Sequence, residues 1–316
     1  MLHKVTQFLA SKARLLEVCL DRESRKCLFC LQLVTQTAPA IVSPWVRELG
    51  IKQWRSTFQK CEDCDLGFFS YRYNPMEMGL IYGKYRSDEY FKVRNRWEPW
   101  YSNAYNANHE SKDWVESRKL VIEDFIYGLL QSDNLRIADI GGDKGQFIPD
   151  IASFKYIVEL SNKVLDPGVV RVDALSELPE VDLIIYAHVL EHVSDPIGEV
   201  LTLFTKAKQI YIEVPWGVPK LDRKRKSLLR FCIMLFRSFF PGLWRIKTSP
   251  ATGRQNPSLH VLQQSEHLTF FSETSISVLA KLVGAEVVVK RTEIMTPDHS
   301  IGSVLQCLFT IRPKIQ

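Results

Sequence analysis

Short apolar runs recur through the second half of the chain and predict the strands of a sheet. Five runs follow residue 134, each short enough for a buried strand and each bounded by polar or glycine-containing segments. They cover residues 135–140, 154–160, 169–174, 181–187 and 209–214. Such a succession of buried strands with helix-like segments between them predicts an α/β domain over residues 135–316.

Two further runs near the C-terminus predict a β-pair that closes this sheet. They cover residues 285–291 and 304–312. A helix is expected to precede them, because Ser272 or Thr274 can cap its N-terminus and Gly284 can end it after Val283.

The first half of the chain lacks this pattern and is expected to form smaller units. Residues 1–26 mix apolar and charged positions at helical spacing without a continuous apolar stretch, which predicts a helical segment and not a secretory signal. Residues 91–134 form a connector rich in Trp, Tyr and Asn, with a predicted helix over 115–130. We expect these aromatic side chains to pack between modules, although they could also stack on a sugar or a base.

The first predicted strand ends in a glycine-rich turn, Asp139-Ile140-Gly141-Gly142-Asp143-Lys144-Gly145, and a helix-like segment over 146–151 follows it. Glycine lacks a Cβ, so it can take positive φ and let backbone N–H groups approach a ligand. Asp143 interrupts the glycines, but Asp tolerates the left-handed conformation better than most residues. The turn is therefore expected to form.

Candidate ligand-binding residues follow the next predicted strands. Glu159 lies twenty positions after Asp139, where a carboxylate can accept both hydroxyls of a ribose. Asp173 and Ala174 end the third strand, and His188 follows the fourth. The turn and Glu159 together predict a site for a nucleoside-containing cofactor.

An acid at the strand end followed by G-x-G-x-G resembles the cofactor loop of class I S-adenosylmethionine (SAM) methyltransferases, with Asp143 in place of the middle glycine. The segment His188-Val-Leu-Glu-His-Val-Ser-Asp-Pro196 is similar to a "vLEHv-dP" motif of the same family. The resemblance implies a Rossmann-like, seven-stranded class I methyltransferase sheet that binds SAM. The positions that match the cofactor site are Asp139, Gly141, Gly142, Asp143, Gly145, Glu159, Asp173, Ala174 and His188.

Two C-x-x-C pairs, Cys27–Cys30 and Cys61–Cys64, lie thirty residues apart. Each pair can point two sulfurs at one ion, so together they predict a tetrahedral Zn²⁺ site in a small zinc-ribbon-like module over 27–90. A redox dithiol and a chance pairing are the alternatives. Four thiolates leave no open position on the metal, so a zinc ion here is expected to be structural.

The second knuckle and the aromatic segment after it, through Tyr82 and Tyr85, resemble a module found in front of many SAM methyltransferases. Among these are sugar C-methyltransferases, which act on nucleotide-linked keto sugars. Glu266-His267-Leu268 is similar to their "hEHl-yfS" segment, whose histidine is proposed to act as a base. The resemblance makes His267 and His192 the leading catalytic candidates, since histidine has the unperturbed pKa closest to neutrality.

The net charge of +5 on 316 residues is concentrated in one segment. Residues 220–247 hold nine Lys or Arg and one acid, a local net charge of +8, interleaved with apolar residues. A basic insertion of this kind over 220–250 can lie on an anionic membrane surface, pack beside the active site, or bind phosphate groups of a nucleotide-linked sugar, a lipid-linked sugar or RNA. No apolar run reaches 18 residues, so we expect a cytoplasmic protein, peripheral to the inner face of the membrane if the first interpretation holds.

The sequence therefore predicts a SAM-dependent methyltransferase that acts on a sugar or a related small molecule, at oxygen or carbon, in glycan or natural-product biosynthesis. An RNA methyltransferase and a non-catalytic scaffold of the same fold are the alternatives. No N/D-P-P-Y/F/W motif follows the fourth strand, which disfavours amino-group methylation. Outside the knuckles, Cys19, Cys232 and Cys307 are not at the ends of strands four or five, which disfavours covalent pyrimidine chemistry.

Overall fold

The structure is a computed structural model that describes residues 26–85, 87–98, 101, 107, 111–127, 134–159, 164–219, 262–296 and 301–311. The predicted N-terminal helical segment and the basic insertion lie outside these residues. Within the described part of the chain, no helix is long and apolar enough to span a membrane.

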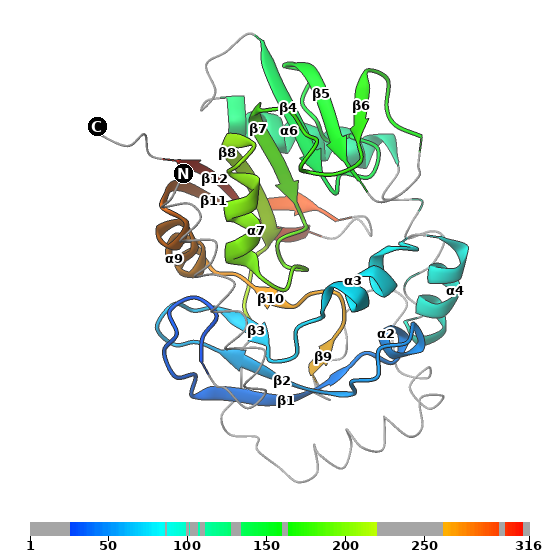
Figure 1. The fold of residues 1–316 in the computed structure, drawn as a ribbon, viewed down its shortest axis with the longest axis vertical. Coiled ribbons are helices and arrows are strands. Elements are labelled where there is room, and N and C mark those ends of the chain that lie inside the picture. The colour runs from blue at the N-terminus through cyan, green and yellow to red at the C-terminus, as the bar shows by residue number, and fades with distance from the viewer. Residues whose placement is uncertain are drawn as a thin grey trace.

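The larger of two sheets contains seven strands in the order β11-β12-β8-β7-β4-β5-β6. Strands β4 to β8 run parallel, whereas β12 is antiparallel to β8 and to β11 (Figure 1). This order, with its reversed C-terminal pair, confirms the predicted class I methyltransferase sheet. The strands are β4 (Leu135–Ile140), β5 (Ala152–Val158), β6 (Val169–Val172), β7 (Val181–Ala187), β8 (Ala207–Pro215), β11 (Ala285–Met295) and β12 (Ile301–Ile311).

Alternate residues of the central strands pack against helices on opposite faces of this sheet. Ile137, Leu183 and Ile185 face α6 (Lys112–Tyr127), the helix predicted in the connector. Ala138 and Ile184 join the cluster with α7 (Pro196–Leu203) and α9 (Glu273–Val283). This alternation is the two-residue period of a strand that is buried on both faces.

Helix α9 begins and ends as predicted. The Ser272 hydroxyl accepts a hydrogen bond from the Ser275 N–H at the N-terminus, and Gly284 takes a left-handed conformation, φ +72°, at the C-terminus. Strands β11 and β12 then form the closing β-pair.

The predicted helix over 146–151 is wrong. These residues form consecutive turns, in which the Ile148 N–H donates to Gly145 O at 3.2 Å and the Ala152 N–H donates to Pro149 O at 3.1 Å. Proline cannot donate a helical hydrogen bond and disfavours helical φ/ψ at the residue before it. Only six residues separate Gly145 from β5, so the crossover has no room for a helix beyond Pro149.

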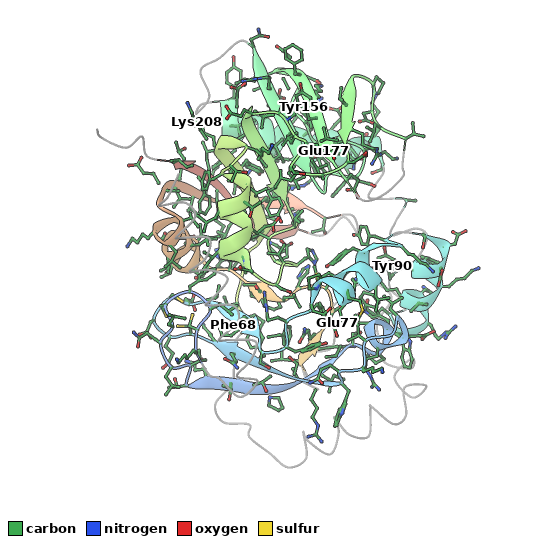
Figure 2. The ribbon with its side chains drawn as sticks, viewed as in Figure 1. Phe68, Glu77, Tyr90, Tyr156, Glu177 and Lys208 are labelled. Carbon is green, nitrogen blue, oxygen red and sulfur yellow. The ribbon has the colours of Figure 1, made fainter. Side chains whose placement is uncertain are left out.

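The N-terminal module contains a five-stranded sheet in the order β10-β3-β2-β1-β9. Its strands are β1 (Gln36–Val42), β2 (Arg55–Lys60), β3 (Gly67–Phe69), β9 (Leu262–Gln264) and β10 (Thr269–Phe270). Three helices complete it, α2 (Pro44–Glu48), α3 (Pro75–Tyr82) and α4 (Asp88–Trp97). Figure 2 shows Phe68 on the strand side of the module and Glu77 and Tyr90 on its helical side.

Strands β9 and β10 come from the part of the sequence expected to belong to the C-terminal domain. Strand β9 pairs with β1 in parallel, and β10 pairs with β3 in antiparallel orientation. In Figure 1, β10 lies between the main sheet and β1–β3. Backbone hydrogen bonds therefore join the two parts of the molecule within one sheet.

Several aromatic residues of the connector pack against neighbouring elements. The Tyr101 ring lies 6.0 Å from the Tyr90 ring, and the Trp114 ring lies 5.6 Å from the Phe147 ring, as measured between centroids. For Tyr101 and Trp114, the structure therefore supports packing between neighbouring elements.

Candidate functional site

The glycine-rich turn begins at the carboxyl end of β4 and takes the left-handed conformation at three positions. The φ angles are +76° at Gly141, +61° at Asp143 and +79° at Gly145. Asp143 therefore adopts the conformation that a glycine at this position would adopt, as the sequence predicted. The substitution leaves the path of the turn intact.

Asp139 lies beneath this turn and is almost completely buried. A Cβ added at Gly142 would lie 1.9 Å from Asp139 Oδ2, so only glycine lets the turn pass this closely over the carboxyl group. Burial, together with the nearby carboxylates of Glu159 and Asp143, raises the pKa of Asp139 to about 7. A cationic ligand placed above the turn would favour its ionised form.

The turn also brings Glu159 into position. The Asp143 N–H donates a hydrogen bond to Glu159 Oε2 at 3.0 Å. Glu159, the residue predicted to bind the ribose of the cofactor, therefore faces the turn. Asp173 and Ala174 follow β6, the edge strand, one strand beyond Glu159. Asp173 is exposed there.

His188 follows β7 and lies on the other side of β4 from Glu159. Its φ is +56°, and its Nε2 atom lies 2.9 Å from Glu213 Oε1. Burial would lower the pKa of His188, but the carboxylates of Glu191 and Glu213 more than offset this and raise it to about 9. His188, which is predicted to contact the cofactor, therefore carries a protonated imidazole ring at neutral pH.

Glu213 is a buried member of the site that the sequence analysis did not identify. Arg118 of α6 forms an ion pair with it, and the Tyr211 hydroxyl donates to Glu213 Oε2 at 2.8 Å. Burial would raise the pKa of Glu213, but Arg118 and His188 bring it down to about 2. Glu213 is therefore a carboxylate inside the protein.

A signal for this ion pair was present in the sequence. Glu213 ends an otherwise apolar run, and Arg118 falls on the helix face that also carries Ile122 and Phe125. Charged residues in core positions are rare unless they are paired. Two such residues in one domain are candidates for a pair.

The two predicted catalytic histidines lie together. The His192 and His267 rings are 4.8 Å apart, as measured between centroids, in an edge-on arrangement. The hydroxyl of Tyr82, from α3, lies 2.9 Å from His192 Nδ1. Burial and the proximity of His192 lower the pKa of His267 to about 4, so His267 is neutral at physiological pH.

Long-range hydrogen bonds fix the two loops that carry these histidines. The Leu268 N–H donates to Glu191 O at 2.8 Å. The Arg72 guanidinium donates to Val193 O and to Leu268 O, at 2.6 and 2.8 Å. The N-terminal module thus connects the loop after β7 to the loop before β10.

A second buried ion pair holds the residue next to His267. Glu266 accepts hydrogen bonds from the Arg94 guanidinium, at 2.8 Å, and from the Tyr90 hydroxyl, and both donors come from α4. Burial would raise the pKa of Glu266, but Arg94 and the neighbouring histidines lower it. A charged Glu266 anchors this loop to the N-terminal module.

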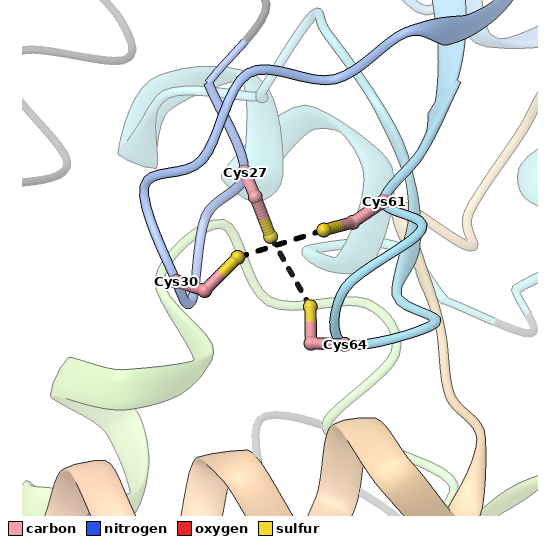
Figure 3. A group of neighbouring side chains, drawn as sticks. All are labelled: Cys27, Cys30, Cys61 and Cys64. Carbon is pink, nitrogen blue, oxygen red and sulfur yellow. Dashed lines mark hydrogen bonds between the residues drawn. The ribbon is translucent and has the colours of Figure 1, made fainter.

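The four predicted zinc ligands converge on one point between the two knuckles (Figure 3). The Sγ atoms of Cys27 and Cys64 are 3.4 Å apart, and those of Cys30 and Cys61 are 3.5 Å apart. Tetrahedral Zn–S bonds of about 2.3 Å place sulfurs roughly 3.8 Å apart, so the group fits a zinc ion. All four residues are free of disulfides.

Solved structures of methyltransferases are similar to this chain at low sequence identity. The 1,6-didemethyltoxoflavin-N1-methyltransferase of Burkholderia thailandensis is 9% identical, and the match covers 81% of this chain and 96% of that one with a TM-score of 0.45. For the magnesium protoporphyrin IX methyltransferase of Synechocystis PCC 6803, the identity is 13%, the coverage 70% and 96%, and the TM-score 0.38. A SAM-dependent methyltransferase from Aquifex aeolicus is 12% identical, and the match covers 65% of this chain and 98% of that one with a TM-score of 0.37.

No protein-family model matches the sequence, and no curated protein is similar to it. The class of the fold is nevertheless defined by the strand order, the reversed β11–β12 pair and the glycine-rich turn after β4. It is the class I methyltransferase fold, joined to an N-terminal module with a four-cysteine group that is consistent with a zinc site.

Proposed function

We propose that this protein is a SAM-dependent methyltransferase that acts on a small-molecule acceptor. The observation that carries the proposal is a hydrogen bond from the backbone N–H of Asp143, a residue in the left-handed conformation, to the Glu159 carboxylate. It lies beside β4, where the strand order changes direction and where open α/β sheets bind their ligands. The Glu159 carboxylate would accept hydrogen bonds from the ribose hydroxyls of SAM. Asp139 would lie beneath the positively charged methionine part of SAM.

The acceptor is proposed to be a sugar or a related molecule that is methylated at oxygen or carbon. In the reaction, the acceptor atom forms a bond to the methyl carbon while the electron pair of the broken C–S bond returns to sulfur. The protein must hold the acceptor in line and remove its proton. His192 and His267 lie at the same sheet edge as the turn and are only partly buried, so they can reach an acceptor.

The N-terminal module contributes to the proposed acceptor site. Tyr82 from α3 contacts His192, and Arg72 holds the loops on both sides of the histidine pair. The module therefore contributes directly to the acceptor side, as a substrate-recognition element would. We propose that Zn²⁺ in the four-cysteine group keeps this module folded.

The scaffold alternative is testable with the same measurement. Asp143, in place of the usual glycine, is the feature that would favour a scaffold without SAM binding, but its left-handed backbone matches the conformation that a glycine would take. The RNA alternative would use the zinc module and the basic insertion over 220–250 as contact surfaces, and the insertion lies outside the described residues.

Calorimetric titration of the zinc-containing protein with SAM tests the proposal. We expect micromolar binding, and Glu159→Ala should weaken it about tenfold to a hundredfold, because a charge-assisted hydrogen bond contributes about 1.5–3 kcal/mol. Asp182→Asn is the matched control, since Asp182 is an acid at the opposite end of β7 that contacts Arg136. A folded protein that does not bind SAM would contradict the methyltransferase assignment.

A further inference from the structure

Three potential metal ligands meet on the acceptor side, outside the cysteine group. Glu191 and His192 follow β7, and His267 precedes β10. One ligand atom from each residue lies within 4.8 Å of those of the other two. Two imidazoles and one carboxylate are a common ligand set for divalent transition-metal ions.

The Glu191 carboxylate has no hydrogen-bond partner, although both of its oxygens are buried. The nearest donors are His188 Nδ1 at 3.4 Å and His192 Nε2 at 3.8 Å from Oε1, and no donor contacts Oε2 within the described residues. A buried carboxylate that lacks hydrogen bonds is costly unless a cation compensates for it. The His188 imidazolium compensates part of this charge on the Oε1 side, whereas Oε2 has no donor in the described part of the chain and remains available to a further ligand.

The surroundings of His192 suit a metal ligand. Its Nδ1 atom is engaged by the Tyr82 hydroxyl at 2.9 Å, and its Nε2 atom faces Glu191. Metal-ligating histidines usually use their other ring nitrogen in a hydrogen bond of this kind, which fixes the tautomer and the ring orientation. Tyr82 would be the outer partner.

The backbone beneath the three residues is held in place. Glu191 O accepts hydrogen bonds from the N–H groups of Leu268 and Thr269, at 2.8 and 3.1 Å, so the two loops are tied together directly at the ligand positions. Metal–ligand bonds of about 2.1 Å require ligand atoms roughly 3.0–3.4 Å apart. The three ligand atoms would therefore have to move closer together to bind an ion.

We propose that Glu191, His192 and His267 bind a divalent transition-metal ion that holds oxygen atoms of the methyl acceptor. This inference rests on the proposed methyltransferase function and deepens it. Three protein ligands leave coordination positions open, unlike the four thiolates of the cysteine group. In this arrangement the two histidines hold the metal ion, and the ion contacts the acceptor. Without the ion, the histidines would contact the acceptor directly and accept its proton.

The inference is tested by titrating Co²⁺ into the full-length protein with one Zn²⁺ bound in the four-cysteine group. We expect one further equivalent of Co²⁺ to bind, with visible d–d bands but without the intense sulfur-to-cobalt band that a thiolate site would give. Glu191→Gln and His267→Gln should each weaken this binding at least tenfold. Glu199→Gln is the matched control, because Glu199 is a carboxylate on α7 that accepts from the Tyr186 hydroxyl at 3.0 Å and lies outside the cluster.

Two outcomes would overturn the inference. One is the absence of a second equivalent in the unmodified protein, and the other is Co²⁺ binding that Glu191→Gln and His267→Gln leave unchanged while circular dichroism shows them to be folded. SAM binding is measured by calorimetry on the same samples. Co²⁺ binding without SAM binding would contradict the methyltransferase assignment only, and SAM binding without Co²⁺ binding would contradict the metal site only.

Discussion

The cofactor side and the acceptor side of this site are built in different ways. The central part of the cofactor side, from Asp139 to Glu159, is one continuous segment whose geometry comes from backbone conformation, including three left-handed residues. Its other predicted members, Asp173, Ala174 and His188, follow β6 and β7. The acceptor side combines the loop after β7, the loop before β10 and helix α3 of the N-terminal module. Buried ion pairs and long-range hydrogen bonds hold these elements together.

The difference shows where each side is vulnerable. A change on the cofactor side should act locally, through the turn. The acceptor side depends on the N-terminal module, so a change far from the histidines should still disturb it. The predictions below test this contrast, from the largest expected effect to the smallest.

Loss of the cysteine group should have the largest effect, because it removes the support of the acceptor side. Cys61 is completely buried, and Cys61→Ser should lower the zinc content by roughly one ion per chain. A structural zinc site contributes on the order of 10 kcal/mol, so the thermal unfolding midpoint should fall sharply or a separate early transition should appear. Elemental analysis and calorimetric unfolding measure the two effects.

Cys307→Ser is the matched control, since Cys307 is equally buried but lies on β12, away from the zinc ligands. It should keep its zinc and cost only about 1–3 kcal/mol for a buried hydroxyl. Equal zinc contents in the two variants would contradict the assignment of the ligands.

Breaking the ion pair behind His188 should have the next largest effect. Glu213→Gln leaves the buried Arg118 guanidinium without its counter-charge and should lower the free energy of unfolding by about 3–5 kcal/mol in urea titrations. Asp182→Asn, at a half-exposed contact with Arg136, should cost less than about 1 kcal/mol. Similar losses in both variants would contradict a buried ion pair between Arg118 and Glu213.

On the cofactor side, Asp139 should make stability depend on pH. Its pKa is about 7 in the folded protein and close to 3.8 in the unfolded chain, so between these values only the folded state keeps the proton. Stability contributed by this group is therefore lost as the pH rises from 4 to 7. Relative to the unmodified protein, Asp139→Asn should gain up to about 4 kcal/mol over this interval, as measured by urea unfolding at several pH values. A constant difference would contradict a buried, protonated Asp139.

Asp143 should give the smallest effect. Asp143→Gly keeps the left-handed turn and should change the free energy of unfolding by less than about 1 kcal/mol, with SAM affinity within about threefold of the unmodified protein. Asp143→Val places a β-branched residue at positive φ and should cost about 1–2 kcal/mol. Calorimetric SAM titration and thermal unfolding check both variants. Strong SAM binding gained only in the glycine variant would show that Asp143 impairs the site.

Features set by local sequence could be predicted. The strand positions follow from short apolar runs, the bounds of α9 from Ser272 and Gly284, and the left-handed turn from the residues around Asp143. The convergence of the cysteines also followed from their spacing. In the first three cases a few neighbouring residues determine the backbone conformation, and in the cysteine group each C-x-x-C pair forms a local turn that points its two sulfurs at one ion.

Features set by distant contacts could not be predicted in the same way. Charged residues at core positions mark Arg118 and Glu213 as candidates for a pair, but no local pattern specifies that these two meet. None specifies the contact of Tyr82 with His192 either, across 110 positions. The sharing of one sheet between the N-terminal module and residues 262–270 depends on strand pairing that short strands do not encode. The failed prediction at 146–151 has a different cause, since the apolar spacing was helical but Pro149 and the short crossover prevent a helix.

A crystal structure of the protein with bound S-adenosylhomocysteine, the demethylated product of SAM, tests the central claim most directly. If the two sides form one active site, the ribose hydroxyls will contact the Glu159 carboxylate and the sulfur atom will face His192 and His267. Density for the product elsewhere, or a sulfur atom that faces away from both histidines, would contradict the account.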